Sequence, residues 1–385
     1  MFKRFLSIAL AVTSITLSFA ACGSNNDVYT PEPSGDEGNY ECETSWDAVA
    51  NIKAGWNLGN TLDSISHQPE GTPTDVYETA WGNPVTTKKM ISALKDAGFN
   101  AVRVPVTWED HIDRKGNIDK EWLDRVQEVV GYVMSLDMYC IVNIHHDAGA
   151  DGWLHASEGN YSENGDVYAR IWEQVADRFK DYDEKLMFES VNEMLDDNSN
   201  WGYPSEEAAK GMTLYTQRFV DTIRSGEGYN KTRNLVVMTY AGSASNAISD
   251  FVVPEDTVED HLILEIHDYS PADFCWLESW MTPTDVWGSD EDKAEMDAFF
   301  VDTDKRVKEL GLPLIIGEWG SQSKDNESER AEHAAYFAKK VHEYGYAAFW
   351  WDCGEFALLD RPNEKILRPE IVEAIINASE AGEDK

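Results

Sequence analysis

Positive charge is scarce in this 385-residue chain, which has 32 lysine and arginine residues against 71 aspartate and glutamate residues. The formal net charge of −39 makes the surface repel nucleic-acid phosphates and anionic lipid headgroups. We therefore expect no nucleic-acid partner and no binding driven by charge to a bare lipid surface. A substrate that is neutral or hydrated fits this balance better.

Cysteine is also sparse. Beyond Cys22 the chain has only Cys42, Cys140, Cys275 and Cys353, and no two of them form a CxxC pair. HExxH spacing is missing as well, so we expect no metal site and no other cofactor. Cys140 lies in an apolar run and is expected in the core. A glycine-rich phosphate loop is lacking too, which disfavours a nucleotide-binding, doubly wound sheet.

Long apolar runs are missing except at the N-terminus. Residues 1–21 have Lys3 and Arg4, then an apolar stretch, then small residues, which is the anatomy of a signal peptide. Ala20-Ala21-Cys22 resembles a bacterial lipoprotein cleavage box, in which Cys22 is acylated. This predicts an exported lipoprotein of the outer membrane, cell surface or periplasm. Ordinary cleavage after Ala20 and secretion of a free protein is the alternative. The polar residues 22–45 are predicted to form a flexible tether.

Residues 46–385 alternate between short apolar runs and stretches with helical periodicity. Eight runs are predicted as strands: 54–59, 100–106, 138–146, 185–193, 234–240, 261–269, 312–320 and 346–352. Helices are predicted around 85–97, 122–133, 167–179, 212–223, 290–310, 326–345 and 367–380, with a short one near 243–251. Strands that are apolar on both faces and alternate with helices predict a parallel sheet covered by helices. We therefore predict a single-domain α/β (β/α)8 TIM barrel, expected as a monomer.

Polar side chains gather where these predicted strands end, which is the side on which such barrels carry their active sites. They are Arg103, His145, His146, Asn192, Glu193, His267, Asp268, Tyr269, Glu318, Trp319, Trp350, Trp351 and Asp352. Glu193 and Glu318 belong to the fourth and seventh strands, which face each other across an eight-stranded barrel. Two carboxylates across a pocket are what glycoside cleavage requires.

Several neighbouring residues are expected to have other roles. Glu189, four residues before Glu193, is predicted to lie lower in the barrel as a member of a structural ion pair. Trp350 is expected in the core because Trp351 points to the opposite face of the same strand. Trp319 can belong to either environment, and Asp268 is expected to be a solvated loop acid.

The motifs from about Trp46 onward resemble those of glycoside hydrolase family 5, the large cellulase family of retaining (β/α)8 enzymes. The stretches that carry the resemblance are "GWNLGNTLD", "ETAWGNP", "VRVPVTW", "NIHH", "FESVNE", "HDYSP", "IIGEWG" and "WWDCG". The first three are most similar to subfamily 4, which contains endo-β-1,4-glucanases and enzymes that cleave xyloglucan or mixed-linkage glucan. The resemblance implies a retaining endo-β-1,4-glucanase acting on a β-glucan polysaccharide.

The resemblance also implies roles for single residues. Glu193 would be the acid/base and Glu318 the nucleophile, with Arg103 orienting Glu318. Asn192 would bind the sugar 2-OH, and His267 and Tyr269 would flank Glu193 and Glu318. His145 would line the pocket, His146 would touch the minus-side sugar, and Trp351 would be the sugar platform. Trp56, Asn57 and Trp81 would shape the minus subsites.

Three positions depart from the family pattern: Met194, Cys353 and the loop "SPADFCW" after Tyr269. None of them removes a catalytic group, but each can alter the glucan subsites. A β-mannanase or xylanase of the same fold therefore remains an alternative. A non-catalytic surface protein that binds glycans is a further one, although such a protein would be expected to have lost at least one of the residues above.

Overall fold

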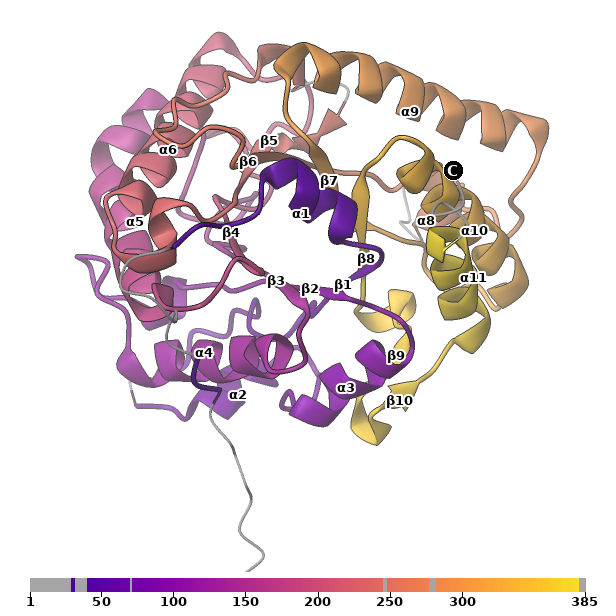
Figure 1. Cartoon of the computed structure of the whole chain (residues 1–385), viewed down its shortest axis with the longest axis horizontal. Coiled ribbons are helices and arrows are strands. Elements are labelled where there is room, and N and C mark those ends of the chain that lie inside the picture. Colours follow the sequence, from indigo (N-terminus) through magenta and orange to yellow (C-terminus); the bar gives the residue numbers. More distant parts are fainter. Residues whose placement is uncertain (1–28, 32–39, 70, 245–247, 277–281, 381–385) are drawn as a thin grey trace, which may run out of the picture.

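Eight parallel strands close into a barrel in the computed structural model, which describes residues 29–31, 40–69, 71–244, 248–276 and 282–380 (Figure 1). Each predicted apolar run overlaps one strand, so the (β/α)8 prediction is confirmed. The strands are β1 (Gly55–Asn57), β2 (Ala101–Val104), β3 (Tyr139–Asn143), β4 (Leu186–Glu189), β5 (Leu235–Ser243), β6 (Leu262–His267), β7 (Leu314–Trp319) and β8 (Ala347–Trp351). A two-stranded antiparallel sheet, β9 (Leu359–Asp360) and β10 (Lys365–Ile366), follows the barrel.

Helices surround the barrel in Figure 1. Their bounds are α1 (Ser45–Asn51), α2 (Thr74–Glu78), α3 (Lys88–Asp96), α4 (Lys120–Met134), α5 (Glu158–Phe179), α6 (Glu206–Arg224), α8 (Ala272–Cys275), α9 (Asp290–Leu310), α10 (Glu327–Glu343) and α11 (Pro369–Glu380). Short 3-10 turns cover Glu109–His111, Gly228–Lys231, Ile248–Asp250, Gly354–Phe356 and Arg361–Asn363.

Serine residues begin three of the long helices. The hydroxyls of Ser157, Ser205 and Ser289 accept backbone N–H groups from the first turns of α5, α6 and α9. Such caps satisfy donors that have no partner inside the helix. These local signals explain why α9 begins where its periodicity predicts.

The short helix predicted near 243–251 falls partly outside the described residues, because residues 245–247 are not among them. β5 continues to Ser243, Ala244 is helical, and Ile248–Asp250 form a 3-10 turn. Ala241 and Gly242 have positive φ values of 57° and 63°, and the pairing of β5 with β6 shifts between Met238 and Ser243. An irregular end of β5 thus directly precedes the segment in which the short helix is predicted.

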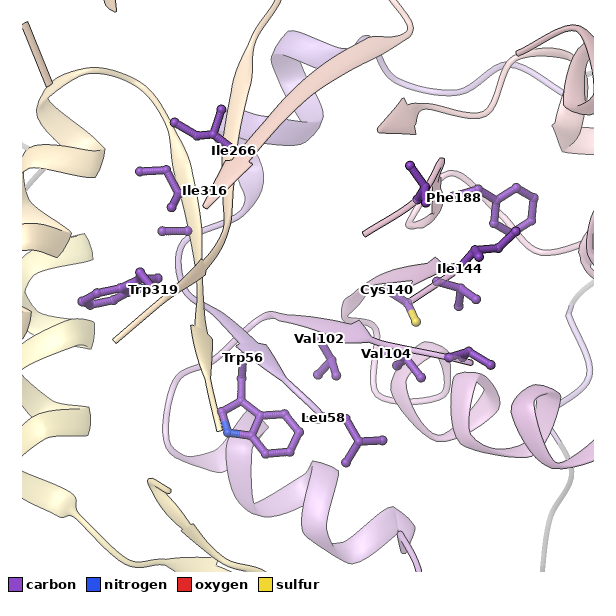
Figure 2. Close-up of a cluster of buried hydrophobic side chains, with 14 of the residues drawn as sticks. Trp56, Leu58, Val102, Val104, Cys140, Ile144, Phe188, Ile266, Ile316 and Trp319 are labelled. Atoms are coloured by element: carbon purple, nitrogen blue, oxygen red, sulfur yellow. The ribbon is translucent and has the colours of Figure 1, made fainter. Parts of the chain in front are cut away.

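The core has two parts, one inside the barrel and one outside. Inside, side chains from the strands form an apolar floor closed by α1, which lies across the barrel in Figure 1. This floor consists of Ala48, Val49, Ile52, Ala101, Tyr139, Ile141, Met187, Val236, Ile263, Ile315, Ala347 and Phe349. The larger outer cluster joins the strands to the helices, and Figure 2 draws part of it, including Cys140 as expected.

A polar layer lies directly above the floor because side chains of a strand alternate between two faces. Two residues beyond Ala101, Met187 and Ile263 come Arg103, Glu189 and Glu265, all fully buried. The sequence of each strand thus places charge at one level of the barrel interior. This layer supports the side chains at the mouth.

Parts of the predicted tether contact the barrel domain. The ring of Tyr29 lies 5.4 Å from that of Tyr182, and the ring of Tyr40 lies 5.2 Å from that of Tyr229. The backbone N–H of Glu43 donates to Glu184 at 2.7 Å. Tyr29, Tyr40 and Glu43 thus lie against the barrel domain, and the flexibility of the tether stays a prediction. The predicted signal segment, 1–21, lies outside the described residues, among which no helix is long and apolar enough to span a bilayer.

We predict that Gly211→Ala in α6 destabilises the protein, although alanine normally favours a helix by about 1 kcal/mol over glycine. A Cβ at Gly211 would lie 2.3 Å from the backbone nitrogen of Ser157. Such overpacking costs about 1–3 kcal/mol, measurable as a lower free energy of unfolding in urea. The control is Gly159→Ala in α5, where the nearest atom would lie 3.9 Å away. Equal effects of both substitutions on stability would contradict this close packing.

Candidate active site

Arg103 is the centre of the hydrogen-bond network inside the barrel. Its Nε and Nη2 donate to the two oxygens of Glu189 at 2.6 and 2.7 Å. Its Nη1 donates to Glu318 at 2.8 Å, and Nη2 donates to Oδ1 of Asn192 at 2.9 Å. Burial alone would lower the pKa of Arg103, but the carboxylates around it raise that pKa well above its usual range. Arg103 is therefore a permanent buried cation that orients acids from two strands.

Glu318 faces the barrel because of an irregularity in β7. Ile315 belongs to the interior floor, so strict alternation would place Gly317 and Trp319 inside and Glu318 outside. The register with β6 shifts between Ile266 and His267, and His267 pairs with Glu318. Such bulges re-aim side chains next to active sites. The shift brings the Glu318 carboxylate to the mouth.

The Glu318 carboxylate is held on both oxygens. Arg103 donates to Oε1, and the Tyr269 hydroxyl donates to Oε2 at 2.9 Å. Burial raises the pKa of Glu318, while the positive charges of His267 and Arg103 oppose that shift. A carboxylate fixed by two donors in this way is oriented for attack along one direction.

Glu193 lies four residues beyond the last residue of β4, where the chain has left the strand. Its φ is 39°, a conformation uncommon for residues other than glycine and often found at functional sites. Its Oε1 lies 2.7 Å from Nδ1 of His267. One carboxylate oxygen each of Glu193 and Glu318 and one ring nitrogen of His267 lie within 4.8 Å of one another. This short gap fits the spacing of retaining glycosidases and not the wider gap of inverting ones.

His267 lies between the two glutamates, with Nδ1 at 3.6 Å from Oε2 of Glu318. Burial by itself would lower the pKa of His267, but Glu318, Glu193 and Glu265 around it raise that pKa to about 10. The imidazole therefore carries a positive charge at neutral pH. It can stabilise negative charge on either glutamate.

Aromatic and imidazole rings form the other side of the mouth. The rings of His145 and Trp351 are stacked 5.8 Å apart at 8°. The ring of His146 lies 4.5 Å from that of His145 and 5.2 Å from that of Trp81, which is 41% exposed. Burial, followed by His146, Arg103 and His267, lowers the pKa of His145 well below its usual range, so it is neutral. These rings are placed where flat apolar faces can bind a sugar.

Trp56 and Asn57 require a correction, because neither reaches the cleft. Trp56 is fully buried in the outer cluster (Figure 2), with Arg361 over its ring at 5.2 Å. Asn57 is fully buried below the mouth, where it donates to Gly317 and accepts from Arg103 at 2.9 and 3.0 Å. The prediction that they shape subsites by direct contact is wrong. Trp56 packs outward in the outer cluster, and Asn57 is bound within the polar layer.

Asp268 is also different from the expectation of a solvated acid. It is 9% exposed, its Oδ1 accepts from Ser270 at 2.7 Å, and its Oδ2 is buried without a hydrogen-bond partner among the described residues. Burial raises its pKa to about 7. Trp350 is in the core as expected, and Trp319 is as well, stacked 4.4 Å from Phe337. Glu189 is the expected ion-pair member.

A cleft of about 700 Å³ extends from Glu193 and His267 toward α9. Its lining includes Trp201, Tyr269, Trp276, Phe299 and Arg306. Trp201 is 54% exposed and lies in the loop between β4 and α6. Tyr269 and the loop that contains Trp276 were singled out from the sequence, but Trp201, Phe299 and Arg306 were not, because loops between strands carry no periodic signal that places them beside a particular strand end.

Two groups at the mouth have the residue types of a metal site: Glu193 with His267 and Glu318, and Asp63 with His145 and His146. The ligand atoms of the first group already have close protein partners. Asp63, which the sequence analysis did not single out, accepts the backbone N–H groups of Asn60 and Thr61 at 3.0 and 2.5 Å. That the chemistry needs no metal remains a prediction.

Two further buried residues of the polar layer were missed. Asn143 donates to Glu189 at 2.8 Å and lies 3.0 Å from Nδ1 of His145. Glu265 stands two residues before His267 on β6. An acid inside an apolar run, as in "FESVNE", is the signal that also marks Glu265 in "LILEIHDY".

Comparison with known proteins gives close matches over most of the chain. The family model for cellulase (glycosyl hydrolase family 5) matches residues 66–357. The cellulase/esterase CelE of Acetivibrio thermocellus is 40% identical over 350 residues, which are 86% of this chain. The chain spans 40% of the length of CelE.

Two solved structures are similar over nearly their whole length. A broad-specificity endoglucanase of subfamily GH5-4 from Ruminococcus champanellensis, solved with cellotriose, has a TM-score of 0.81 and 38% identity, covering 87% of this chain and 98% of its own. A family 5 enzyme from Prevotella bryantii B14, solved with a xyloglucan tetradecasaccharide, has a TM-score of 0.81 and 35% identity. That match covers 88% of this chain and 99% of the other.

We predict that Arg103→Lys lowers kcat by about 100-fold or more, because an ammonium group cannot reproduce the planar fork that holds Glu189, Glu318 and Asn192 together. The matched control is Arg224→Lys on the outer side of the barrel, where Arg224 pairs with Asp256 through two bonds of 2.8 Å. Initial rates on a soluble glucan check this. If both variants lost activity equally, Arg103 would have no special role at the mouth.

Proposed function

The chain belongs to the cellulase family of glycosyl hydrolases, family 5, and we propose on this premise that it is a retaining endo-β-1,4-glucanase that acts as a monomer. The observation that carries the proposal is the cluster of Glu193, His267 and Glu318. One carboxylate oxygen of each glutamate and one ring nitrogen of His267 lie within 4.8 Å of one another, and Arg103 donates to Glu318 from below. Two carboxyl groups this close act as nucleophile and acid/base.

In the first step an oxygen of Glu318 attacks the anomeric carbon and forms a glycosyl ester. The bond from that carbon to the leaving oxygen breaks, and Glu193 gives its proton to that oxygen. Arg103 and Tyr269 hold Glu318 in line for the attack. Asn192 is fixed through its Oδ1 by Arg103, which turns its Nδ2 away from the guanidinium, available for the sugar 2-OH.

In the second step water attacks the same carbon from the side that the leaving group vacated. Glu193, now a carboxylate, accepts a proton from that water, and Glu318 departs as a carboxylate. Two displacements at one carbon retain its configuration. His267 can stabilise negative charge on either glutamate in both steps, because its Nδ1 lies 2.7 Å from Glu193 and 3.6 Å from Glu318.

The substrate class is a β-1,4-linked glucan, with xyloglucan or mixed-linkage β-glucan as further substrates. The bound cellotriose and xyloglucan oligosaccharide of the two similar structures support this class. The cleft of about 700 Å³ beside Glu193 supplies room for sugars beyond the scissile bond. Exposed Trp81 and Trp201 lie where flat ring faces can bind them.

The experiment that tests this function is reducing-sugar release from carboxymethylcellulose, xyloglucan, mixed-linkage β-glucan, xylan and mannan. We expect release from the first three, with a rapid fall in viscosity because internal bonds are cut. Exclusive activity on mannan or xylan would instead favour the alternative enzymes of this fold. A purified, folded protein inactive on the whole panel but retained by glucan in affinity electrophoresis would favour the glycan-binding alternative.

We also propose that the protein is exported and anchored to a bacterial membrane through an acylated Cys22. The small residues before Cys22 and the polar stretch after it support this proposal. The acidic composition would give little attraction to anionic headgroups, so the anchor would have to be hydrophobic.

We predict that Cys22→Ser releases the protein from the membrane fraction of its native host, while activity on soluble glucan per molecule stays the same. The measurement is the distribution of activity between membrane and soluble fractions. The matched control is Gly23→Ala at the next position, which keeps the Cys22 thiol and should leave the protein in the membrane fraction. A wild-type protein that is wholly soluble after export would contradict the lipid anchor.

A further inference from the structure

Glu265 is a buried acid that the proposed reaction does not use. It is fully buried on β6, between the apolar floor below and His267 above. Neither of its carboxylate oxygens has a hydrogen-bond partner among the described residues. A buried carboxyl group without a hydrogen bond is costly, so its presence requires a reason.

The barrel interior makes room for this carboxyl group. A Cβ added at Gly317 would lie 1.6 Å from Oε1 of Glu265, so glycine at that position of β7 is what accommodates the side chain. Only two cationic groups approach it: Nε of Arg103 at 3.4 Å and Nε2 of His267 at 3.6 Å, among the residues that the structure describes. Arg103 is already saturated by Glu189, Glu318, Asn57 and Asn192.

His267, unlike Arg103, is not saturated with hydrogen-bond partners. Within the described part of the chain its Nε2 is buried and has no hydrogen bond, while its Nδ1 contacts Glu193 at 2.7 Å. Glu265 is therefore the group that faces the open side of the imidazole. The result is a chain of three groups from the barrel interior to the mouth: Glu265, His267 and Glu193.

We propose that Glu265 is a positioning residue for the acid/base step, which keeps the His267 imidazole protonated on Nε2 and oriented with Nδ1 on Glu193. The proposal rests on the glycoside cleavage proposed above. It assigns no contact between Glu265 and substrate.

The charges around Glu265, His267 and Glu193 explain why the protonation and orientation of His267 matter. The titratable groups that face Glu265 and His267 are Arg103 on β2, His145 after β3, Glu189 on β4, Glu193 after β4, Tyr269 after β6 and Glu318 on β7. When Glu318 becomes an ester and Glu193 gives up its proton, one negative charge moves from one side of His267 to the other. A cationic imidazole between them stabilises the charge in both places, provided that it stays protonated and does not rotate.

Glu265 supports the cation at any pH at which its own carboxyl group is ionised. Burial, followed by the charge of Glu189, raises the pKa of Glu265 to about 7, whereas Arg103 and His267 lower it. His267, with a pKa of about 10, is protonated at the pH at which Glu265 ionises. Removing the Glu265 charge should lower the pKa of His267, because one of the carboxyl groups that raise it is gone.

The test is Glu265→Gln, which keeps the shape and removes the charge. In protein with ¹⁵N-labelled histidine, the His267 resonances, assigned by their loss in His267→Asn, should show a cation past pH 9 in the wild type. In Glu265→Gln the titration midpoint should fall by at least one pH unit. Glu265→Asp keeps the charge and should leave His267 cationic past pH 9. Asp256→Asn removes a buried charge paired with Arg224 outside the barrel and should leave the midpoint unchanged.

Kinetics supply a second readout. The ratio of wild-type to Glu265→Gln activity on glucan should grow as the pH rises through the midpoint of His267 in the variant. The loss should be smaller on a dinitrophenyl cellobioside, whose leaving group needs no proton. An unchanged His267 midpoint, or a loss independent of pH and equal on both substrates, would overturn the proposal. Failure of the wild type on the glucan panel would instead overturn the function, since the titration does not depend on activity.

Discussion

The buried guanidinium of Arg103 is the interaction on which the mouth of this barrel depends. An arginine with no exposed surface is stable only if its charge and donors are matched, and breaking such a buried pair typically costs about 3–5 kcal/mol. Glu189 compensates the charge through two short bonds. The remaining hydrogen bonds of Arg103 then hold Asn57 on β1, Asn192 after β4 and Glu318 on β7. One side chain thereby sets the relative positions of groups far apart in the sequence.

Around this centre the two catalytic candidates receive different surroundings. Glu318 is held by Arg103 and Tyr269, and its side chain is 8% exposed. Glu193 has His267 as its close polar partner and is 24% exposed, so it is more open to the cleft. Chemically identical side chains can therefore take different roles, because one is held on both oxygens for attack and the other is open to exchange a proton with a sugar oxygen or water.

Much of this arrangement could be predicted from the sequence. Eight apolar runs and their spacing predict the barrel. The position of Glu189, four residues before Glu193, predicts it below the mouth, and the period of two in a strand predicts Trp350 in the core. The prediction failed where alternation is interrupted or where side chains compete for a position. Trp56 and Asn57 are neighbours on β1, so only one can point inward, and the inward one lies below the cleft. Asp268 follows β6 and looks like a loop acid, but it is nearly enclosed.

Other features depend on tertiary packing that no local pattern specifies. The bulge that turns Glu318 inward arises from register shifts with both neighbouring strands. The space for Glu265 depends on a glycine far along the chain, at Gly317 of the next strand. Trp201 and Trp276 line the same cleft from loops after different strands. Their roles follow from the closed barrel, which brings distant loops together, and not from the residues themselves.

The most direct test of the roles of Glu318 and Glu193 is to trap the covalent intermediate. A 2-fluoro cellobioside with an activated leaving group should inactivate the enzyme and add one cellobiosyl group, and peptide mass spectrometry should find it on Glu318. Glu193→Ala should still be labelled, because the activated leaving group needs no proton, whereas Glu318→Ala should not. A label on Glu193, or equal labelling of both variants, would contradict the account.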